Sequence, residues 1–433
     1  MNATTMNRRL FLRAGGFGLA AAATSCARSS GSERAAAADV ATAFDAVVQE
    51  FMQARGVPGG ALAVVKDRRL IYAKGYGWAD REKEIPATPE SLFRIASISK
   101  PVTAAAVLKL VEAGKLSLDA KAFDIVRRSP LITNDQPMDS RLARITIREL
   151  LQHTGGWDRD KSFDPMFRPK RIAEETGTPA PAGPDAVIRY MLGQPLNFDP
   201  GQRYAYSNFG YCVLGRVIEK VSGVGYEQFV REQVLRPAGI RNMQVGATLD
   251  GRQAKGEVRY YTQDSALTEN VFARGPRRVP QPYGGFHLEA MDAHGGWIAS
   301  AVDLARFAAA LDDPNASPLL TPDTIRTMYA PPDAPAWRND AGKLADAFYG
   351  CGWMVRPHIA SGRANYWHSG SLPGTATLLV RRWDGLSWAV LFNQRSNTNA
   401  LPDSAIDPAL HRAAAAVKHW PAHDLFSKYT KRN

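Results

Sequence analysis

The chain has 433 residues and a formal net charge of +12, from 54 Lys and Arg against 42 Asp and Glu. Hydrophobic residues make up 45% and charged residues 22%, a globular composition that excludes a disordered or fibrous chain. The positive charge is spread along the sequence without a nucleic-acid-binding module, so we expect a soluble basic surface and no nucleic-acid partner.

The start of the chain has the features of an export signal. Arg8 and Arg9 form a twin-arginine pair, and an uncharged stretch rich in Ala and Gly follows at 14–25. That stretch is shorter than the roughly 20 apolar residues of a transmembrane helix, but it fits the apolar part of a signal peptide. We therefore expect residues 1–25 to be a twin-arginine signal, and the protein to be periplasmic or held in the cell envelope.

The signal ends in a sequence that resembles the cleavage box of bacterial lipoproteins, Ala23-Thr24-Ser25-Cys26. Ala23 departs from the leucine usual at that position, and ordinary cleavage nearby is the alternative. Lipidation of Cys26 would anchor the protein to the membrane. Residues 26–38, which are rich in Ala, Ser and Arg, are interpreted as a flexible tether.

Strand patterns lie near both ends of the remaining chain, and helical patterns fill its middle. The periodicity predicts a helix at 39–55, then a β-hairpin with strands at 60–65 and 70–76. Further helices are predicted at 102–113, 145–152, 185–192, 211–221 and 303–311, with long Pro- and Gly-rich loops at 154–184 and 251–296. A second hairpin, 375–380 and 387–392, and a helix at 405–419 follow.

These elements predict an α+β fold in which both chain ends build one antiparallel sheet flanked by helices. We assign 39–425 to a single domain. Its α/β part comprises about 39–95 and 290–425, and its largely helical part about 96–289. A cleft between the two parts is where an active site is expected.

The first candidate catalytic segment is Ser97-Ile98-Ser99-Lys100-Pro101. Proline is tolerated only in the first turn of a helix, so Pro101 predicts a helix start at about 97–99. Ser97 would then lie at the positive helix end, with Lys100 on the same face. A buried lysine can lose its charge by desolvation and accept the serine proton. Alone the pattern is weak, because a helix cap followed by a surface lysine has the same spacing.

The second segment is Tyr206-Ser207-Asn208, which follows a turn and precedes a predicted helix. Tyr206 and Asn208 would point the same way on an extended backbone. A phenol beside an ammonium is shifted toward its anion and can act as a general base. A stacked core tyrosine and a helix cap are the alternative, which is favoured when this segment is considered alone.

The third segment is His368-Ser369-Gly370-Ser371, directly before the second hairpin. Gly370 would let a substrate approach an edge strand closely. The amide of Ser371 could then donate to an oxyanion together with the amide of Ser97. The alternative is a glycine-rich turn with an exposed histidine.

Taken together and in this order, the three segments resemble the signatures of the class C β-lactamase-like serine hydrolases: Ser-x-x-Lys, Tyr-x-Asn and Lys/His-x-Gly. That family includes penicillin-binding D,D-peptidases, D-aminopeptidases and esterases. The stretches 150–156 and 295–305 resemble further family segments. The resemblance covers about residues 40 to 420 and implies the β-lactamase/transpeptidase-like fold.

The resemblance also implies roles for the site residues. Ser97 attacks a carbonyl, and Lys100 with Tyr206 handles its proton. Asn208 orients Lys100 or a substrate amide, and the amides of Ser97 and Ser371 hold the oxyanion. Water then releases the acyl group. His153, in the stretch 150–156, is expected to organise a loop rather than to act in catalysis.

One residue departs from the β-lactamase pattern. β-Lactamases and D,D-peptidases usually carry lysine where His368 stands, and a lysine there helps to hold a substrate carboxylate. Histidine is mostly neutral at pH 7, so this attraction is weakened. We therefore expect hydrolysis of esters or small amides, ranked above β-lactamase, D,D-peptidase or D-aminopeptidase activity. An envelope-anchored penicillin-binding sensor or scaffold without turnover is the alternative from another class.

Other site chemistries find little support in the sequence. The nearest match to an α/β-hydrolase nucleophile elbow, 385–389, lies inside a predicted strand and is rejected. No metal-ligand spacing or cofactor motif is present, so we expect a small-molecule or peptide-like substrate and neither metal nor cofactor. Cys212 and Cys351 are interpreted as small buried residues, with a disulfide as the less favoured alternative. The sequence does not determine the oligomeric state.

Overall fold

The computed structural model describes residues 18–132, 137–264, 267–333, 335–338, 342–343, 345–396, 398 and 400–429, with side chains from residue 31 onward. The twin-arginine pair Arg8 and Arg9 lies outside the described residues, as does the side chain of Cys26. Within the described part of the chain, no helix is both long enough and apolar enough to cross a membrane.

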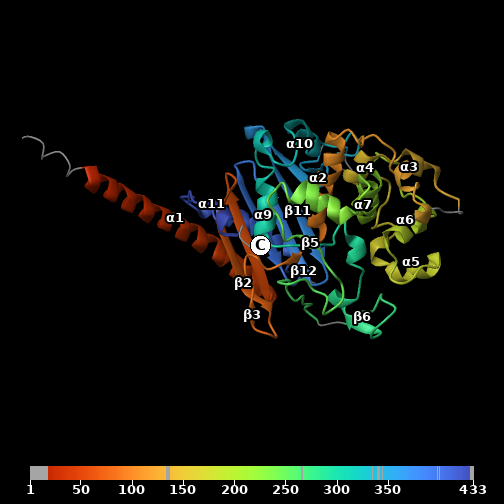
Figure 1. Ribbon diagram of the computed structural model, residues 1–433, viewed down its shortest axis with the longest axis horizontal. Coiled ribbons are helices and arrows are strands. Elements are labelled where there is room, and N and C mark those ends of the chain that lie inside the picture. The colour runs from red at the N-terminus through yellow and green to blue at the C-terminus, as the bar shows by residue number, and fades with distance from the viewer. Residues whose placement is uncertain are drawn as a thin grey trace, which may run out of the picture.

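The molecule is built around an eight-stranded antiparallel sheet with strands from both ends of the chain (Figure 1). The order is β3-β2-β1-β13-β12-β11-β10-β9. The strands are β1 Gly59–Lys66, β2 Arg69–Asp80, β3 Ile85–Pro86, β9 Phe348–Tyr349, β10 Met354–His358, β11 Arg363–Leu372, β12 Thr375–Arg381 and β13 Leu386–Phe392. Both predicted hairpins are confirmed, and β1 joins them by pairing with β13 from Gly60 opposite Phe392 to Lys66 opposite Leu386.

Both faces of this sheet are covered, which explains why its central strands are apolar throughout. All seven residues of β12 and all seven of β13 are buried. On one face, Leu62 and Val64 pack with α1 (Gly18–Arg55) and α11 (Ile406–Ala416). On the other face, Ala61 and Ala63 belong to the core shared with α9 (Ala301–Ala309) and with the helical part of the chain. The alternation along β1 therefore assigns successive side chains to two different cores.

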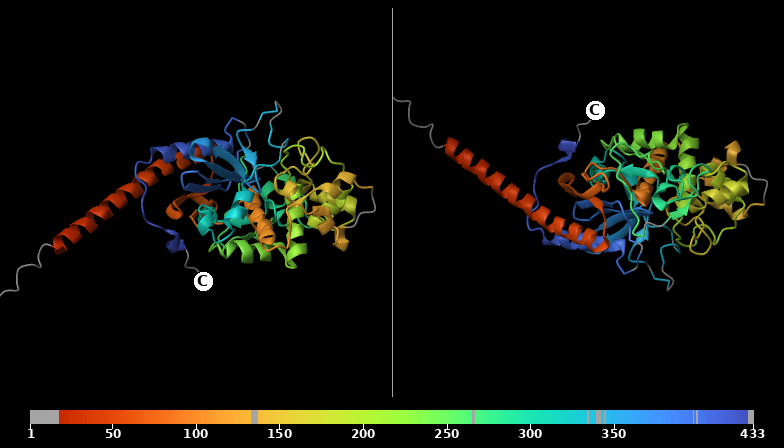
Figure 2. Two further views of the ribbon diagram at one scale, coloured as in Figure 1. Left: turned by 90° about the horizontal axis from the view of Figure 1, so that it is seen from above. Right: turned by 90° about the horizontal axis from the view of Figure 1, so that it is seen from below.

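Helix α1 begins earlier than the sequence suggested, and its N-terminal half projects from the body of the protein (Figure 2). Residues 26–38, expected to be a flexible tether, are helical here. The run Ala35–Ala38 gives a physical reason, because alanine is the strongest helix former. Glu33 also ties the helix to the C-terminal segment, since its Oε1 accepts the N–H groups of Ala422 and His423 at 2.7 and 2.8 Å.

The helical part lies between the two hairpins in sequence and beside the sheet in space (Figure 1). Its helices are α2 Ser99–Glu112, α3 Ala122–Val126, α4 Ile147–Leu151, α5 Pro169–Thr176, α6 Pro184–Leu192, α7 Asn208–Ser222 and α8 Tyr226–Val230. Helix α10 (Pro322–Met328) follows later. The helices predicted at 102–113, 145–152, 185–192, 211–221 and 303–311 are confirmed, with shifts of a few residues at their ends.

The two long loops contain structure that the sequence did not predict. Helix α5 lies within 154–184, and the small hairpin of β6 (Leu267–Glu269) and β7 (Arg278–Pro280) lies within 251–296. A three-stranded sheet of β4 (Phe93–Arg94), β8 (Trp297–Ala299) and β5 (Gln244–Val245) joins this second loop to the segment just before Ser97. The predicted α+β architecture is otherwise confirmed.

Candidate active site

Ser97 lies in a single 3-10 turn, η1 (Ala96–Ile98), which leads directly into α2. The prediction of a helix start at 97–99 is therefore confirmed, with the α-helical part beginning at Ser99. Ala96 has a φ of +48°, a left-handed conformation that is strained for any residue with a Cβ atom. The hydroxyl of Ser99 donates to the Ala96 carbonyl at 2.7 Å and stabilises the turn. Ser97 remains partly exposed between buried neighbours.

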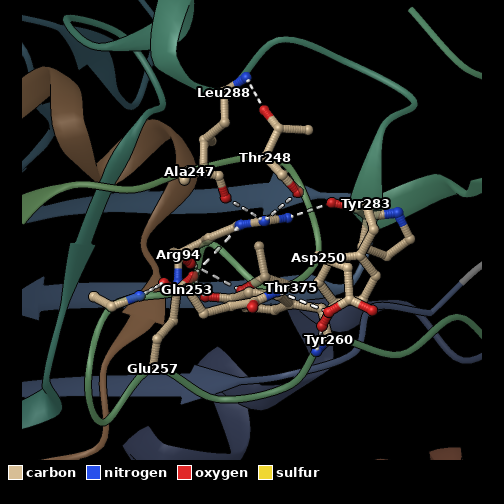
Figure 3. A network of polar contacts seen from close by, with 12 residues as sticks. Arg94, Ala247, Thr248, Asp250, Gln253, Glu257, Tyr260, Tyr283, Leu288 and Thr375 are labelled. Carbon is tan, nitrogen blue, oxygen red and sulfur yellow. Dashed lines mark hydrogen bonds and ion pairs between the residues drawn. The ribbon is translucent and has the colours of Figure 1, made fainter. Parts of the chain in front are cut away.

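The strand just before this turn is anchored by a buried arginine, Arg94 (Figure 3). The guanidinium of Arg94 is fully buried and donates to the carbonyls of Pro282 at 2.7 Å and Ala247 at 2.8 Å. It also stacks on the Tyr260 ring at 4.2 Å and lies 3.8 Å from a carboxylate oxygen of Glu257. Loop 247–283 is thereby fastened to the residue three positions before Ser97.

Lys100 is completely buried with its amine against the nucleophile. Its Nζ lies 3.2 Å from Ser97 Oγ, 2.8 Å from Asn208 Oδ1 and 2.9 Å from the carbonyl oxygen of His294. Burial lowers the pKa of Lys100 well below its usual range, while the Asp164 carboxylate opposes this shift. The amine is therefore shifted toward the neutral form that can accept a proton.

Tyr206 reaches the same point from the segment before α7. Its ring centroid lies 4.6 Å from Lys100 Nζ. Burial raises the pKa of Tyr206, and the influence of the Ser97 side chain offsets this only in part. The expectation of a phenol shifted toward its anion is therefore wrong, because Tyr206 is itself buried and loses the water that would stabilise the anion. The phenol is held in its protonated form at neutral pH.

His153 organises the loop that carries Tyr206, as expected. Its carbonyl accepts the N–H of Ala205 at 2.9 Å, and its Nδ1 accepts the N–H of Ser207 at 3.2 Å. Its ring is buried and lies 4.3 Å from the Tyr206 ring, centroid to centroid. The backbone of His153 is in the left-handed region, with φ +58°.

Asn208 begins α7 and uses both ends of its amide. Oδ1 faces Lys100, whereas Nδ2 donates to Asp164 Oδ2 at 2.6 Å. Of the two expected partners, Lys100 is present, and Asp164 is a further partner that was not expected. Arg159, from the same loop, lies over the Tyr206 ring at 4.9 Å. Neither Asp164 nor Arg159 was predicted from the sequence.

Strand β11 borders the site with its free edge. Strand β10 pairs with β11 only from Arg363 to Trp367, so the backbone from His368 to Leu372 has no partner from β10. The turn η1 packs against this strand. The amide of Ser371 belongs to this free portion of β11, and the Ser371 side chain is exposed.

The structure explains why position 370 has no side chain, and this explanation was not expected from the sequence. A Cβ atom there would lie 2.2 Å from the carbonyl oxygen of Ile95 and 2.3 Å from Thr377 Oγ1. The hydroxyl of Thr377 also donates to the same Ile95 carbonyl at 3.0 Å. Gly370 therefore allows the segment that leads into the Ser97 turn to approach the strand closely.

His368 is buried and both of its ring nitrogens are occupied. Nδ1 lies 2.7 Å from the Ser369 carbonyl, which can only accept, so Nδ1 carries the proton. Nε2 then accepts the hydroxyl of Tyr349 at 2.9 Å. Burial lowers the pKa of His368 to about 3, and the charge of Lys100 adds to this effect. The ring is neutral at pH 7.

Metal-ligating side chains and thiols in the described part of the chain are the other groups that could carry chemistry. No group of three or more His, Cys, Asp or Glu side chains there is arranged to hold a metal ion. Cys212 and Cys351 are buried free thiols, as expected, and burial raises the pKa of Cys351 to about 12.

A partly exposed serine beside a buried lysine and a tyrosine, at the junction of an antiparallel sheet and a helical part, is typical of the β-lactamase-fold serine hydrolases. The chain belongs to the beta-lactamase family, whose family model matches residues 44–411. Membership confirms the resemblance drawn from Ser97, Tyr206 and His368 and their neighbours.

Individual relatives are more distant. A putative fimbrial assembly protein FimD, serogroup D, from Dichelobacter nodosus is 32% identical over 311 residues, covering 70% of this chain and 66% of that protein. The chain thus matches just under two thirds of that relative's length.

Two solved structures are similar over most of the chain. An octameric penicillin-binding protein homologue from Pyrococcus abyssi is 26% identical, with a TM-score of 0.64, over 88% of this chain and 78% of that one. The D-amino acid amidase from Ochrobactrum anthropi SV3 has a TM-score of 0.66 over 88% of this chain and 99% of that one. At 21% identity it supports the fold alone.

Proposed function

We propose that this protein is an exported hydrolase that forms an acyl-enzyme on Ser97, with esters or small amides as substrates. The observation that carries the proposal is the contact of 3.2 Å between Ser97 Oγ and the amine of a completely buried Lys100. A desolvated amine at this distance is a base matched to a serine hydroxyl.

The reaction follows from the protonation states of the site. Neutral Lys100 takes the Ser97 proton as Oγ bonds to the substrate carbonyl carbon, and the amides of Ser97 and Ser371 stabilise the oxyanion. Protonated Tyr206 gives its proton to the leaving oxygen or nitrogen as that bond breaks, and the Lys100 ammonium returns a proton to Tyr206. Water attacks the acyl-enzyme by the same route in reverse.

The two contacts of His368 favour esters and small amides over β-lactams. His368 is neutral and both of its nitrogens are occupied, so it offers no charge to a substrate carboxylate. A β-lactam presents a carboxylate, and that carboxylate finds no charged or free partner in His368.

The test is a substrate panel of short p-nitrophenyl esters, D-amino acid amides and a cephalosporin, with Ser97→Ala as control. We expect ester turnover in the wild type and loss of at least about a thousandfold in the variant. Efficient cephalosporin turnover without esterase activity would reverse the ranking. Mass spectrometry after a fluorophosphonate separates an enzyme, which is labelled on Ser97, from a scaffold, which is not.

Export and anchoring are proposed from the leader alone. Fractionation of the producing cells tests both, with Cys26→Ala as the matched variant. We expect the wild type in the membrane fraction and Cys26→Ala in the soluble periplasm. Protein that stays in the cytoplasm would contradict the signal, and an unchanged distribution of the variant would contradict lipidation.

A further inference from the structure

The amide of Asn208 lies between two groups of opposite hydrogen-bonding character. A carboxylate can only accept hydrogen bonds, whereas an amide has an accepting oxygen and a donating nitrogen. Asp164 Oδ2 lies 2.6 Å from one end of the amide and Lys100 Nζ 2.8 Å from the other. The carboxylate therefore determines which way the amide is turned: Nδ2 must face Asp164, which leaves Oδ1 for Lys100.

Asp164 is itself held rigidly. Its other oxygen, Oδ1, accepts the N–H of Met166 at 3.1 Å, at the start of a short 3-10 turn, η4 (Pro165–Phe167). The Asp164 side chain is only 12% exposed. Burial raises its pKa, while the hydrogen bonds from Asn208 and Met166 and the charge of Arg159 favour the carboxylate. Because the Asp164 carboxylate is held in place, it can hold the Asn208 side-chain amide in one orientation.

Lys100 is surrounded by groups from several elements. Its neighbours are Ser97 of η1, Asn208 and the ring of Tyr211 from α7, the ring of Tyr206, the His294 carbonyl, the rings of His153, His294 and His368, and the charges of Arg159 and Asp164. Asp164 is the acidic member of this set. Its charge favours the ammonium form of Lys100 and acts against desolvation and Arg159.

We propose that Asp164 is a positioning residue: its carboxylate locks the Asn208 amide with Oδ1 toward Lys100, and its negative charge limits how far the amine is neutralised. This inference rests on the proposed function, in which Lys100 is the base for Ser97. Asp164 touches neither the nucleophile nor, in this arrangement, the substrate, and it acts through Asn208.

Two substitutions separate the charge of Asp164 from its hydrogen bond. Asp164→Asn keeps an accepting oxygen for Asn208 and removes the charge. We expect the acid limb of the kcat/KM profile for a p-nitrophenyl ester to move to lower pH by about one unit, because loss of a nearby anion favours neutral Lys100. Asp164→Ala removes both, so the amide can turn its N–H toward the amine. We expect kcat to fall about tenfold or more with little change in KM.

The matched control is Asp160→Asn, which removes a charge from the same loop at a side chain that is 92% exposed. This control should keep the acid limb and kcat of the wild type. An acid limb unchanged in Asp164→Asn, together with wild-type kcat in Asp164→Ala, would overturn the proposal.

A second measurement is independent of turnover. In protein labelled with 13C-lysine, the pKa of Lys100 is followed by NMR, and it should be lower in Asp164→Asn than in the wild type. A lowered pKa in a protein without esterase activity would support the role of Asp164 and refute the proposed reaction. An unchanged pKa would refute the electrostatic part of the role of Asp164 even in an active esterase.

Discussion

Lys100 and Tyr206 occupy one desolvated pocket, and desolvation acts on them in opposite directions. It lowers the pKa of the amine and raises the pKa of the phenol, so both groups favour their uncharged forms. An uncharged amine is a base and an uncharged phenol is an acid. The same physical cause therefore supplies both partners that acyl transfer requires.

The pH dependence of the reaction follows from these two shifts. The proposed reaction requires Lys100 deprotonated and Tyr206 protonated, so kcat/KM should rise through the lowered pKa of Lys100. Burial raises the pKa of Tyr206 so far above its ordinary value that we expect no alkaline limb from this group in the range of an assay. His368, with a pKa of about 3, should add no limb between pH 5 and 8. We expect Tyr206→Phe to lose roughly a hundredfold or more in kcat/KM. Tyr204→Phe, two residues earlier, is the control and should keep the wild-type kcat/KM.

Gly370 provides a test of the contact between strand and nucleophile turn. In Gly370→Ala the new methyl group collides with the carbonyl oxygen of Ile95, so the turn must move. We expect a loss of about 1–3 kcal/mol in the free energy of unfolding and at least a tenfold loss in kcat/KM. Gly295→Ala is the control, because its Cβ would lie 3.9 Å from the backbone of Ala96. Equal losses of stability and kcat/KM in Gly370→Ala and Gly295→Ala would contradict a specific role of the contact at Gly370.

The sequence predicted Ser97, Lys100 and Tyr206 because short spacings encode their type and direction. It did not predict Asp164 or Arg94. Asp164 precedes a proline and looks like an ordinary turn cap, and its contact with Asn208 joins residues 44 positions apart. Arg94 is an arginine in an apolar segment, a position that gives no sign of the carbonyl groups that bind it. Contacts between residues far apart in the chain leave no local pattern in the sequence from which they could be predicted.

At the scale of elements, the strands with continuous apolar runs or tight turns were predicted and the others were not. Strand β11 mixes exposed, half-buried and buried residues because only part of it has partners on both sides. Strands β9 and β10 are short and lie at the sheet edge, where the apolar pattern is weakest. Partial pairing is what makes β11 useful to the site, and it is also what conceals the strand in the sequence.

The N-terminal helix offers a test at this scale. Val40 is fully buried, and the carboxylates of Glu33 and Asp39 accept backbone N–H groups of the C-terminal segment, Asp39 from Lys418 at 2.9 Å. A chain beginning at residue 31 keeps these contacts, whereas one beginning at residue 41 loses them. We expect the shorter chain to lose about 3 kcal/mol in the free energy of unfolding, measured in urea. Equal stabilities would show that residues 31–40 act only as a tether.

At the scale of the whole molecule, one core runs from the sheet into the helical part, and three histidines are buried around the site. Burial lowers the pKa of His153, His294 and His368. Between the unfolded pKa of about 6.5 and the lower folded value, the unfolded chain binds more protons than the folded one. The stability from each histidine is therefore complete above about pH 6.5 and is lost as the pH falls.

We expect this loss to be about 1.4 kcal/mol per pH unit for each histidine, seen as a steep fall in unfolding free energy from pH 6.5 to 5. His294→Gln removes one titrating ring and keeps the backbone carbonyl that Lys100 contacts. The slope of the unfolding free energy against pH should become shallower in this variant by about 1.4 kcal/mol per pH unit. Parallel curves for the two proteins would contradict this assignment.

The pairing of Gly60 with Phe392 has a consequence for synthesis. Strand β1 leaves the ribosome early, and β13, which closes its open edge, leaves more than 300 residues later. During most of translation, the nascent chain therefore exposes one unpaired edge of an apolar strand. Such an edge favours aggregation. We expect the sheet to be completed only after the last hairpin has been made, because β1 and β13 come from opposite ends of the chain.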